Sequence, residues 1–219
     1  MDTLTRCGVI GDVHCEDETL ERVLDVLSTM EVEPVLCVGD LVDGLGDADR
    51  TLELLRDRGV QCVAGNHERW FLNNKHRTLA NITTSITDAS RTFIEPLPKL
   101  KHYKTPHGNA LLCHGVGEDD EAWLLPDTHG FGLQEIPTLR ELMLDDSVQF
   151  MIGGHTHERM VRQFPGLTVI NAGTIHRSFE QVFGVIDFVE MCIAFRSAAP
   201  HNTGELIEER EIPRPAPLS

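Results

Sequence analysis

Five short polar clusters of this chain each follow directly after an apolar run, and together they hold side chains that bind divalent metal ions. The clusters are Asp-Val-His at 12–14, Gly-Asp-Leu-Val-Asp at 39–43, Gly-Asn-His-Glu at 65–68, His-Gly at 114–115 and Gly-His-Thr-His at 154–157. Carboxylate, imidazole and amide groups suit hard-to-borderline divalent cations. Two such cations held close together are a common device for in-line displacement at phosphorus. The clusters therefore predict metal-assisted chemistry on a phosphate ester.

The order and content of the clusters resemble the calcineurin-like metallophosphoesterase superfamily over about Val9 to Asn171. A single Asp-x-His is weak evidence, whereas all five clusters in this order are specific. The resemblance is to small bacterial-type phosphoesterases, with a partial likeness to the serine/threonine phosphoprotein phosphatases. It implies an α/β fold, namely a four-layer α-β-β-α sandwich of two mixed β-sheets flanked by helices.

The resemblance also implies a dinuclear metal centre with seven protein ligands. The first metal is expected to bind Asp12, His14 and His157, the second Asn66, His114 and His155, while Asp40 bridges both. Mn²⁺ is the expected ion, with Fe, Ni, Mg, Co or Zn as alternatives. Two cations lower the pKa of a bridging water, and the resulting hydroxide attacks phosphorus in line.

Two further residues are expected to act in the chemistry. His67 occupies the position that, in the family, gives a proton to the leaving oxygen, as suits a side chain that titrates near neutral pH. Asp43 matches the second aspartate of the Gly-Asp-x-x-Asp motif and is expected to orient His67 or a metal-binding histidine. Its alternative role is the N-cap of a helix that starts near Asp47. Glu68 either accepts a hydrogen bond beside the metals or faces solvent, and Cys15 is either a buried structural thiol or a soft ligand.

Residue spacing gives expectations for the local geometry of these clusters. The Asp-x-His at 12–14 and the His-x-His at 155–157 each place two ligands two residues apart. Since strand side chains alternate, each pair is expected to lie on one face of a strand or extended segment. The same rule predicts that Asn66 and His67 point apart, so that Asn66 binds a metal while His67 faces the substrate.

The first half of the chain alternates apolar runs with amphipathic helical patterns, which predicts βαβ steps and a largely parallel sheet. Strands are expected at 8–10, 35–38 and 60–63, with helices around 20–27 and 48–55. Because ligands bind beyond the carboxyl ends of parallel strands, the first three clusters are expected to meet in one crevice. Farther along, the pattern predicts irregular helices at 69–92, a hairpin of 100–104 and 109–113, a helix at 136–143, and strands at 149–153, 159–164, 168–171, 181–189, 191–197 and 205–211.

We expect a single domain over residues 1–212, followed by a frayed Pro-rich tail at 213–219. Two cap segments, at about 69–98 and 116–133, are expected to determine the substrate. Among the remaining histidines, His129 and His176 are candidates for lining the pocket.

Composition limits the classes of partner. The chain has 219 residues and a formal net charge of −16, which opposes extended nucleic-acid binding because that requires a basic face. Its six cysteines show no Cys-x-x-Cys pairing, which is typical of free thiols in a reducing compartment. No signal peptide is apparent at the N-terminus, and the longest apolar stretch contains charged residues. A cytoplasmic protein without membrane contact is expected, and the oligomeric state is left open.

The predicted activity is hydrolysis of a small phosphomonoester or phosphodiester, with nucleotides among the candidates. A phosphoprotein or dinucleoside-polyphosphate phosphatase is the lower-ranked alternative, because Gly44 stands where the phosphoprotein phosphatases carry a phosphate-clamping arginine. His67 stands where many small phosphodiesterases of the superfamily have cysteine, which favours monoester turnover as well. A non-catalytic interaction module on the same fold is a further alternative, opposed by the complete ligand set.

Overall fold

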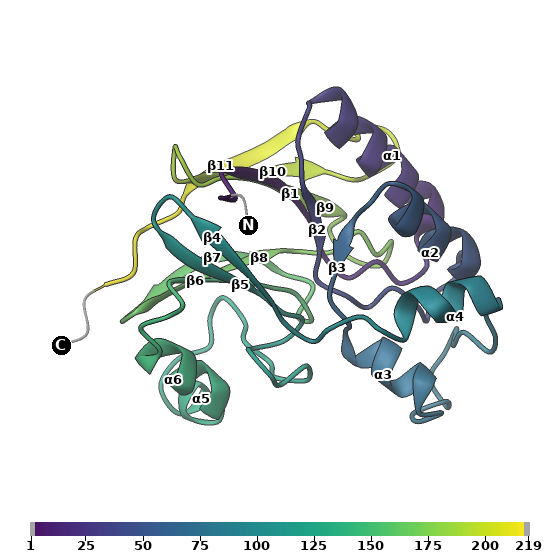
Figure 1. Cartoon of the computed structure of the whole chain (residues 1–219), viewed down its shortest axis with the longest axis horizontal. Coiled ribbons are helices and arrows are strands. Elements are labelled where there is room, and N and C mark those ends of the chain that lie inside the picture. The colour runs from purple at the N-terminus through teal and green to yellow at the C-terminus, as the bar shows by residue number, and fades with distance from the viewer. Residues whose placement is uncertain (1–2, 217–219) are drawn as a thin grey trace.

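Two β-sheets face each other in the computed structural model, which describes residues 3–216 (Figure 1). The first sheet has the strand order β11-β10-β9-β1-β2-β3. Its strands are β1 (Arg6–Ile10), β2 (Val35–Cys37), β3 (Gln61–Cys62), β9 (Val182–Asp187), β10 (Cys192–Ser197) and β11 (Leu206–Glu211). The β1–β2 and β2–β3 pairs are parallel, whereas β9, β10 and β11 add antiparallel neighbours. The sheet is therefore mixed.

The second sheet has the strand order β4-β5-β6-β8-β7. Its strands are β4 (Lys101–Thr105), β5 (Gly108–Leu112), β6 (Phe150–Gly153), β7 (Arg159–Phe164) and β8 (Leu167–Ala172). The β5–β6 and β6–β8 pairs are parallel, and the two outer pairs are antiparallel hairpins. This sheet is mixed as well.

Helices cover the outer faces of both sheets (Figure 1). They are α1 (Asp17–Thr29), α2 (Ala48–Asp57), α3 (Asn66–Leu72), α4 (Asp88–Ile94), α5 (Phe131–Gln134) and α6 (Pro137–Leu144). One apolar cluster joins α1 and α2 to the first sheet, a second fills the space between the sheets, and a third joins α6 to the second sheet. These three apolar layers separate four layers of structure, so the predicted α-β-β-α sandwich is confirmed.

The packing of α1 shows how the sequence produces this layering. Leu20, Val23, Leu24 and Leu27 recur at helical spacing, and all four are buried against the first sheet. Burying each such side chain contributes about 1.5–3 kcal/mol. A Cβ atom at Gly8 of β1 would lie only 2.9 Å from a Leu27 methyl group, so glycine is what lets the helix approach the strand this closely.

The remaining expectations for the elements hold with two refinements. Part of the cap at 116–133 forms α5, a short helix that the sequence did not indicate. Residues 213–216 of the Pro-rich tail are not frayed, because Thr168 donates its hydroxyl to the carbonyl of Pro213 and Gly166 donates its N–H to the carbonyl of Ala216. The rest of the tail, 217–219, lies outside the described residues. Within the described chain, no helix has the length and apolar character needed to cross a membrane.

Candidate metal centre

The expected ligands meet where the carboxyl ends of strands from both sheets face each other. Asp12 and His14 follow β1, Asp40 follows β2 and Asn66 follows β3, whereas His114, His155 and His157 follow β5 and β6 of the second sheet. Ligand atoms lie within 4.8 Å of one another in two groups: Asp12, His14, Asp40 and His157 form one group, and Asp40, His114 and His155 form the other. Asp40 is the residue that the two groups share.

Nitrogen and oxygen atoms within each group point at a common centre. In the first group, Nε2 of His14 lies 3.3 Å from Nε2 of His157. In the second, Nε2 of His114 lies 3.2 Å from Nδ1 of His155 and 2.9 Å from Oδ1 of Asn66. The Asn66 amide oxygen, which is buried, therefore completes the second group.

Asp40 lies between the two groups. Its Oδ2 is 3.6 Å from Nε2 of His14 and 3.2 Å from Nε2 of His114. Only a carboxylate offers two anionic oxygens to neighbouring cations, and its side chain is almost completely buried. This position, between two sets of imidazoles, is the one expected of a bridging ligand.

Backbone carbonyls fix the ring orientation of two of the histidines. His14 donates Nδ1–H to the carbonyl of Asp43 at 2.9 Å, and His114 donates Nδ1–H to the carbonyl of Val38 at 2.9 Å. In both rings Nε2 is therefore the nitrogen that faces the shared centre. Such an outer hydrogen bond to a histidine is a regular feature of metal sites.

The residues present fit a pair of divalent cations. Asp12 is fully buried and its Oδ2 has no hydrogen-bond partner, which is costly unless a cation compensates it. Burial, opposed by His114 and supported by the charge of Asp40, raises the pKa of Asp12 to about 7. Burial also lowers the pKa of His155 to about 4 and that of His157 to about 3, which keeps both rings in the neutral form that binds metals. An orphaned carboxylate oxygen together with the neutral rings of His155 and His157 offers donors to cations.

The turns that present these ligands differ from the expected strand geometry. β1 ends at Ile10 and β6 ends at Gly153, so the ligand pairs at 12–14 and 155–157 lie in loops. The expectation that strand alternation aligns each pair was wrong. Five site residues instead have left-handed backbone conformations: His14, Asp40, Asp43, His155 and His157, with φ between 44° and 68°. Such a conformation costs roughly 1 kcal/mol or more for a non-glycine residue and is typical of functional sites.

Asn66 and His67 also depart from the expected extended segment, because they form the first turn of α3. Consecutive helical side chains point about 100° apart, so the two residues still diverge. Asn66 points at His114, while His67 donates Nδ1–H to Oδ2 of Asp43 at 2.8 Å. The predicted divergence is present, but helix geometry produces it.

Asp43 holds His67 and is itself held by the cap segment. Arg77 contacts both carboxylate oxygens of Asp43, at 2.6 and 3.3 Å, and Thr83 donates its backbone N–H to Oδ1 at 2.7 Å. The N-cap of α2 is Asp47, whose side chain accepts the N–H of Arg50, so the alternative role of Asp43 as a cap is wrong.

Gly44 has no room for the arginine of the phosphoprotein phosphatase motif. A Cβ atom there would lie 1.7 Å from the backbone carbonyl oxygen of His14. A guanidinium group does reach Asp43, from Arg77 in a segment that no motif singled out, but it contacts the Asp43 carboxylate.

Glu68, for which the sequence allowed two roles, is fully buried rather than solvent-facing. Its carboxylate accepts four backbone N–H groups: those of Asp40, Leu41, Val42 and Gly65, at 2.7–3.1 Å. Burial and the nearby charge of Asp40 raise its pKa, against the effect of these hydrogen bonds. Glu68 thereby ties the loop after β2 to the start of α3.

The structure distinguishes three further residues that the sequence left open, Cys15, His129 and His176. The Cys15 thiol is buried, contacts Oγ1 of Thr83 at 3.7 Å and has its pKa raised to about 12, chiefly by burial, so it is a structural thiol. The ring of His176 lies 5.2 Å from that of His14, whereas His129 contacts Arg162 away from the ligands. Of these two histidines, His176 is beside the metal centre.

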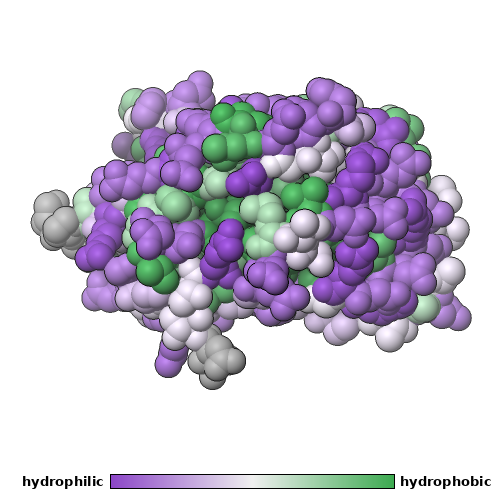
Figure 2. All heavy atoms as spheres, turned by 90° about the horizontal axis from the view of Figure 1, so that it is seen from above, coloured by the Kyte–Doolittle hydropathy of each residue, from purple (hydrophilic) through white to green (hydrophobic). Residues whose placement is uncertain are grey.

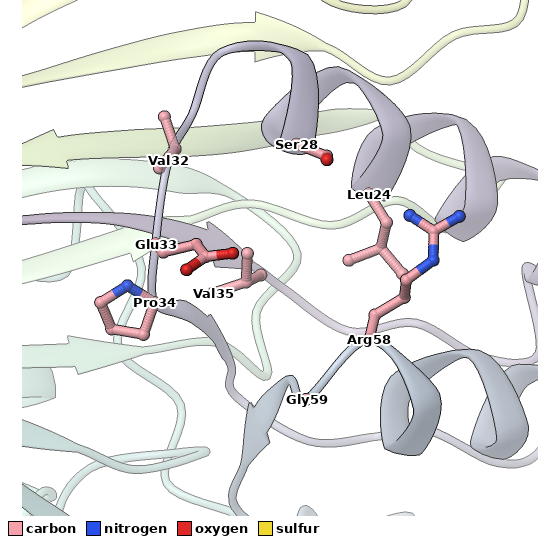
Figure 3. A pocket seen from close by; sticks show the side chains of 8 residues that line it. All are labelled: Leu24, Ser28, Val32, Glu33, Pro34, Val35, Arg58 and Gly59. Carbon is pink, nitrogen blue, oxygen red and sulfur yellow. The ribbon is translucent and has the colours of Figure 1, made fainter.

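A separate hollow of about 540 Å³ lies at the other end of the first sheet (Figure 3). Its lining includes Val35, the first residue of β2, together with Leu24 of α1 and Arg58 after α2. Asp40 follows the opposite end of β2, so this hollow takes no part in the candidate metal centre.

The chain belongs to the calcineurin-like phosphoesterase superfamily, because the family model of that domain matches residues 6–191. A protein of Methanothermobacter thermautotrophicus, named as a probable metallophosphoesterase, is 27% identical over 170 residues, 76% of this chain and 75% of its own length. A metallophosphoesterase structure from Sphaerobacter thermophilus aligns with a TM-score of 0.64 at 18% identity, covering 95% of this chain and 90% of that one. Vacuolar protein sorting 29 from Cryptosporidium parvum shares the fold at a TM-score of 0.56 and 16% identity, with coverages of 94% and 97%.

We expect Asp40→Asn to weaken both metal sites together, because an amide cannot offer anionic oxygens to two cations. Metal content after dialysis against Mn²⁺, measured by mass spectrometry, should fall from two ions per chain towards none. Asp43→Asn is the matched control and should keep both ions, since Asp43 faces His67 and Arg77. An Asp40→Asn protein that retains two tightly bound ions would contradict the bridging role.

We expect metal binding to release protons near neutral pH. Burial disfavours the His114 cation, but the charges of Asp40 and Asp12 outweigh it and raise the pKa of His114 above its usual range. The metal-free ring is therefore protonated at pH 7, and it must lose that proton to bind a cation. Affinity should rise with pH across the neutral range. Calorimetric heats that are identical in buffers of different ionisation enthalpy would show that no proton is released.

We expect Glu68→Gln to lower the free energy of unfolding by about 2–4 kcal/mol, because the new NH₂ group would face backbone N–H groups and leave buried donors unpaired. Urea denaturation of the metal-free protein measures this change. Glu95→Gln, at an exposed position, is the matched control. Equal stability of the two variants would show that Glu68 does not hold the loop after β2 to α3.

Proposed function

We propose that this protein is a dinuclear-metal-dependent phosphoesterase that hydrolyses a small phosphomonoester or phosphodiester. The observation that carries the proposal is the pair of ligand groups that share the buried carboxylate of Asp40. Membership of the phosphoesterase superfamily supports hydrolysis of phosphoric esters in general. Two cations at this centre would supply an easily deprotonated water and neutralise phosphoryl oxygens in the transition state.

The donor set supports Mn²⁺ as the proposed ion. Asp12, Asp40 and Asn66 offer oxygen, four histidines offer nitrogen, and no thiol of the described residues joins either ligand group. Imidazole and carboxylate together suit Mn²⁺ and also Fe, Co, Ni or Zn, whereas Mg²⁺ prefers oxygen ligands alone.

His67 is proposed as the group that gives the leaving oxygen its proton. Its Nδ1–H is held by Asp43, which leaves Nε2 directed towards the centre, 3.9 Å from Oδ2 of Asp40. Burial disfavours the cation, but the hydrogen bond to Asp43 and the charge of Asp40 outweigh it and raise the pKa of His67. A ring whose pKa is raised and whose orientation is fixed is suited to general acid catalysis.

The alternatives have less support. A phosphoprotein phosphatase would need the arginine clamp that Gly44 excludes. A non-catalytic interaction module would not require the orphaned Oδ2 of Asp12 or the two nearly complete ligand groups. A cytoplasmic location stays a prediction, supported by the six free cysteines.

His67→Ala should retain both metal ions but lose about 10²–10⁴ in turnover on substrates with poor leaving groups. The loss should shrink on an activated ester such as bis(4-nitrophenyl) phosphate, whose leaving oxygen scarcely needs a proton. Steady-state kinetics with an alkyl and a nitrophenyl ester measure the difference. His201→Ala, at an exposed position away from the ligands, is the matched control.

Equal losses on both esters would refute the general-acid role and leave His67 as a phosphate-binding donor. Loss of a metal ion from His67→Ala would overturn its separation from the ligand set. Absence of phosphate-ester hydrolysis by the Mn²⁺-loaded protein would contradict the proposed function itself.

A further inference from the structure

Three aromatic side chains each rest on a different histidine of the metal centre. Trp70 lies on His67 with ring centroids 4.7 Å apart, Trp123 meets His155 edge-on at 5.0 Å, and Phe179 meets His157 edge-on at 4.4 Å. We call Trp70, Trp123 and Phe179 the aromatic rim. They come from three separate segments: α3, the cap at 116–133, and the loop between β8 and β9.

The aromatic rim leaves apolar surface uncovered beside a polar centre. Trp123 is 55% exposed and Phe179 is 51% exposed, although each contacts a buried or half-buried histidine. Hydrophilic residues cover most of the face drawn in Figure 2, around several apolar groups near its middle. Exposed rings gathered around a polar centre supply an apolar surface that a ligand can cover.

Hydrogen bonds hold part of the rim in position. The indole N–H of Trp70 donates to Glu121 at 3.1 Å, and Arg69 contacts Asp120 at 2.6 and 2.9 Å. These contacts join α3 to the cap segment that carries Trp123. Trp70 is therefore tied to the segment that carries Trp123 before a ligand arrives, which lowers the entropy cost of binding.

The arginines near the rim and the metal centre bear on whether the substrate carries one phosphate or several. Among the described residues, four arginines are near the rim or the metal centre, either within two positions of one of its residues or in contact with one. All four contact carboxylates: Arg69 contacts Asp120 and Glu121, Arg77 contacts Asp43, Arg159 contacts Glu180 and Glu208, and Arg177 contacts Glu16. Each of these four already contacts a carboxylate, and the net charge of −16 opposes polyanions. A substrate with one phosphoryl group fits this surface better than a polyphosphate.

We propose that the aromatic rim binds the base of a nucleoside, so that the substrate is a phosphate ester with one phosphoryl group and a nucleoside as its leaving group. This inference rests on the proposed function. A phosphoryl group at the metal centre would lie beside the histidines that the rim rings contact at centroid distances of 4.4–5.0 Å. The ribose would then bring the base to Trp123 or Phe179. Stacking on an aromatic side chain strengthens binding of a base by about 5- to 150-fold.

Binding of two phosphonates to the Mn²⁺-loaded protein tests this inference, because a methylene group in place of the ester oxygen prevents hydrolysis during the measurement. The phosphonate analogues of adenosine 5′-monophosphate and of ribose 5-phosphate present the same phosphoryl group and sugar, but only the first has a base. Calorimetry should show that the nucleotide binds at least fivefold more tightly. Since both tryptophans of the chain belong to the rim, the nucleotide should also change the intrinsic fluorescence more than the sugar phosphate does.

Variants of the rim residues test whether the rim causes the preference for the nucleotide over the sugar phosphate. Trp123→Ala and Phe179→Ala should each reduce the ratio of the two affinities, and Trp123→Phe should restore most of it. Phe131→Ala is the matched control, because Phe131 is 82% exposed on α5, outside the rim, and the ratio should be unchanged.

Equal affinities in the wild type, unmeasurable nucleotide binding, or a ratio that no rim variant changes would overturn the inference. Failure of the proposed function would appear differently, as a protein that prefers the nucleotide but hydrolyses no phosphate ester.

Discussion

The candidate metal centre depends on the backbone position of Asp40. This residue has a φ of 50°, and its carbonyl accepts the N–H groups of Val13 and His14 at 2.9 and 2.8 Å. Its own N–H goes to Glu68, and its side chain accepts the N–H of His67. The loops after β1 and β2 and the start of α3 are therefore joined through one residue. A Cβ atom at Gly65 would lie 2.2 Å from Oδ1 of Asp40, so the neighbouring loop must contain glycine at this contact.

The same arrangement places several carboxylates in a buried region. Asp12, Asp40 and Glu68 are all buried, and burial raises the pKa of both Asp12 and Glu68. Buried charges of one sign are unfavourable unless partners or cations compensate them. Four backbone N–H groups compensate Glu68, and the histidines compensate Asp40, whereas Oδ2 of Asp12 has no partner. Burial of the three apolar layers contributes the free energy of folding that offsets the cost of these buried carboxylates.

Much of this architecture could be predicted from the sequence, because strands and amphipathic helices follow from local periodicity. The strand ends, the hairpin of β4 and β5 and the helix α6 all lie within a few residues of their expected places. The turns could not be predicted, since the left-handed conformations of His14 and His155 depend on long-range backbone contacts rather than on residue type. The role of Arg77 was missed, and that of Glu68 was left open between two alternatives, for a related reason. Arg77 reaches Asp43 across 34 positions of the chain, and Glu68 binds backbone groups that leave no mark on the sequence.

The distribution of ligands between the two sheets has a mechanical consequence. Asp12, His14, Asp40 and Asn66 extend from the first sheet, whereas the other three ligands extend from the second. A cation that binds ligands from both sheets would cross-link the two halves of the sandwich. Because a ligand that binds only the folded state adds its binding free energy to folding, occupancy of the centre and resistance of the sheets to separation rise together. Removal of the cations would then loosen the contact between the two sheets as well as emptying the centre.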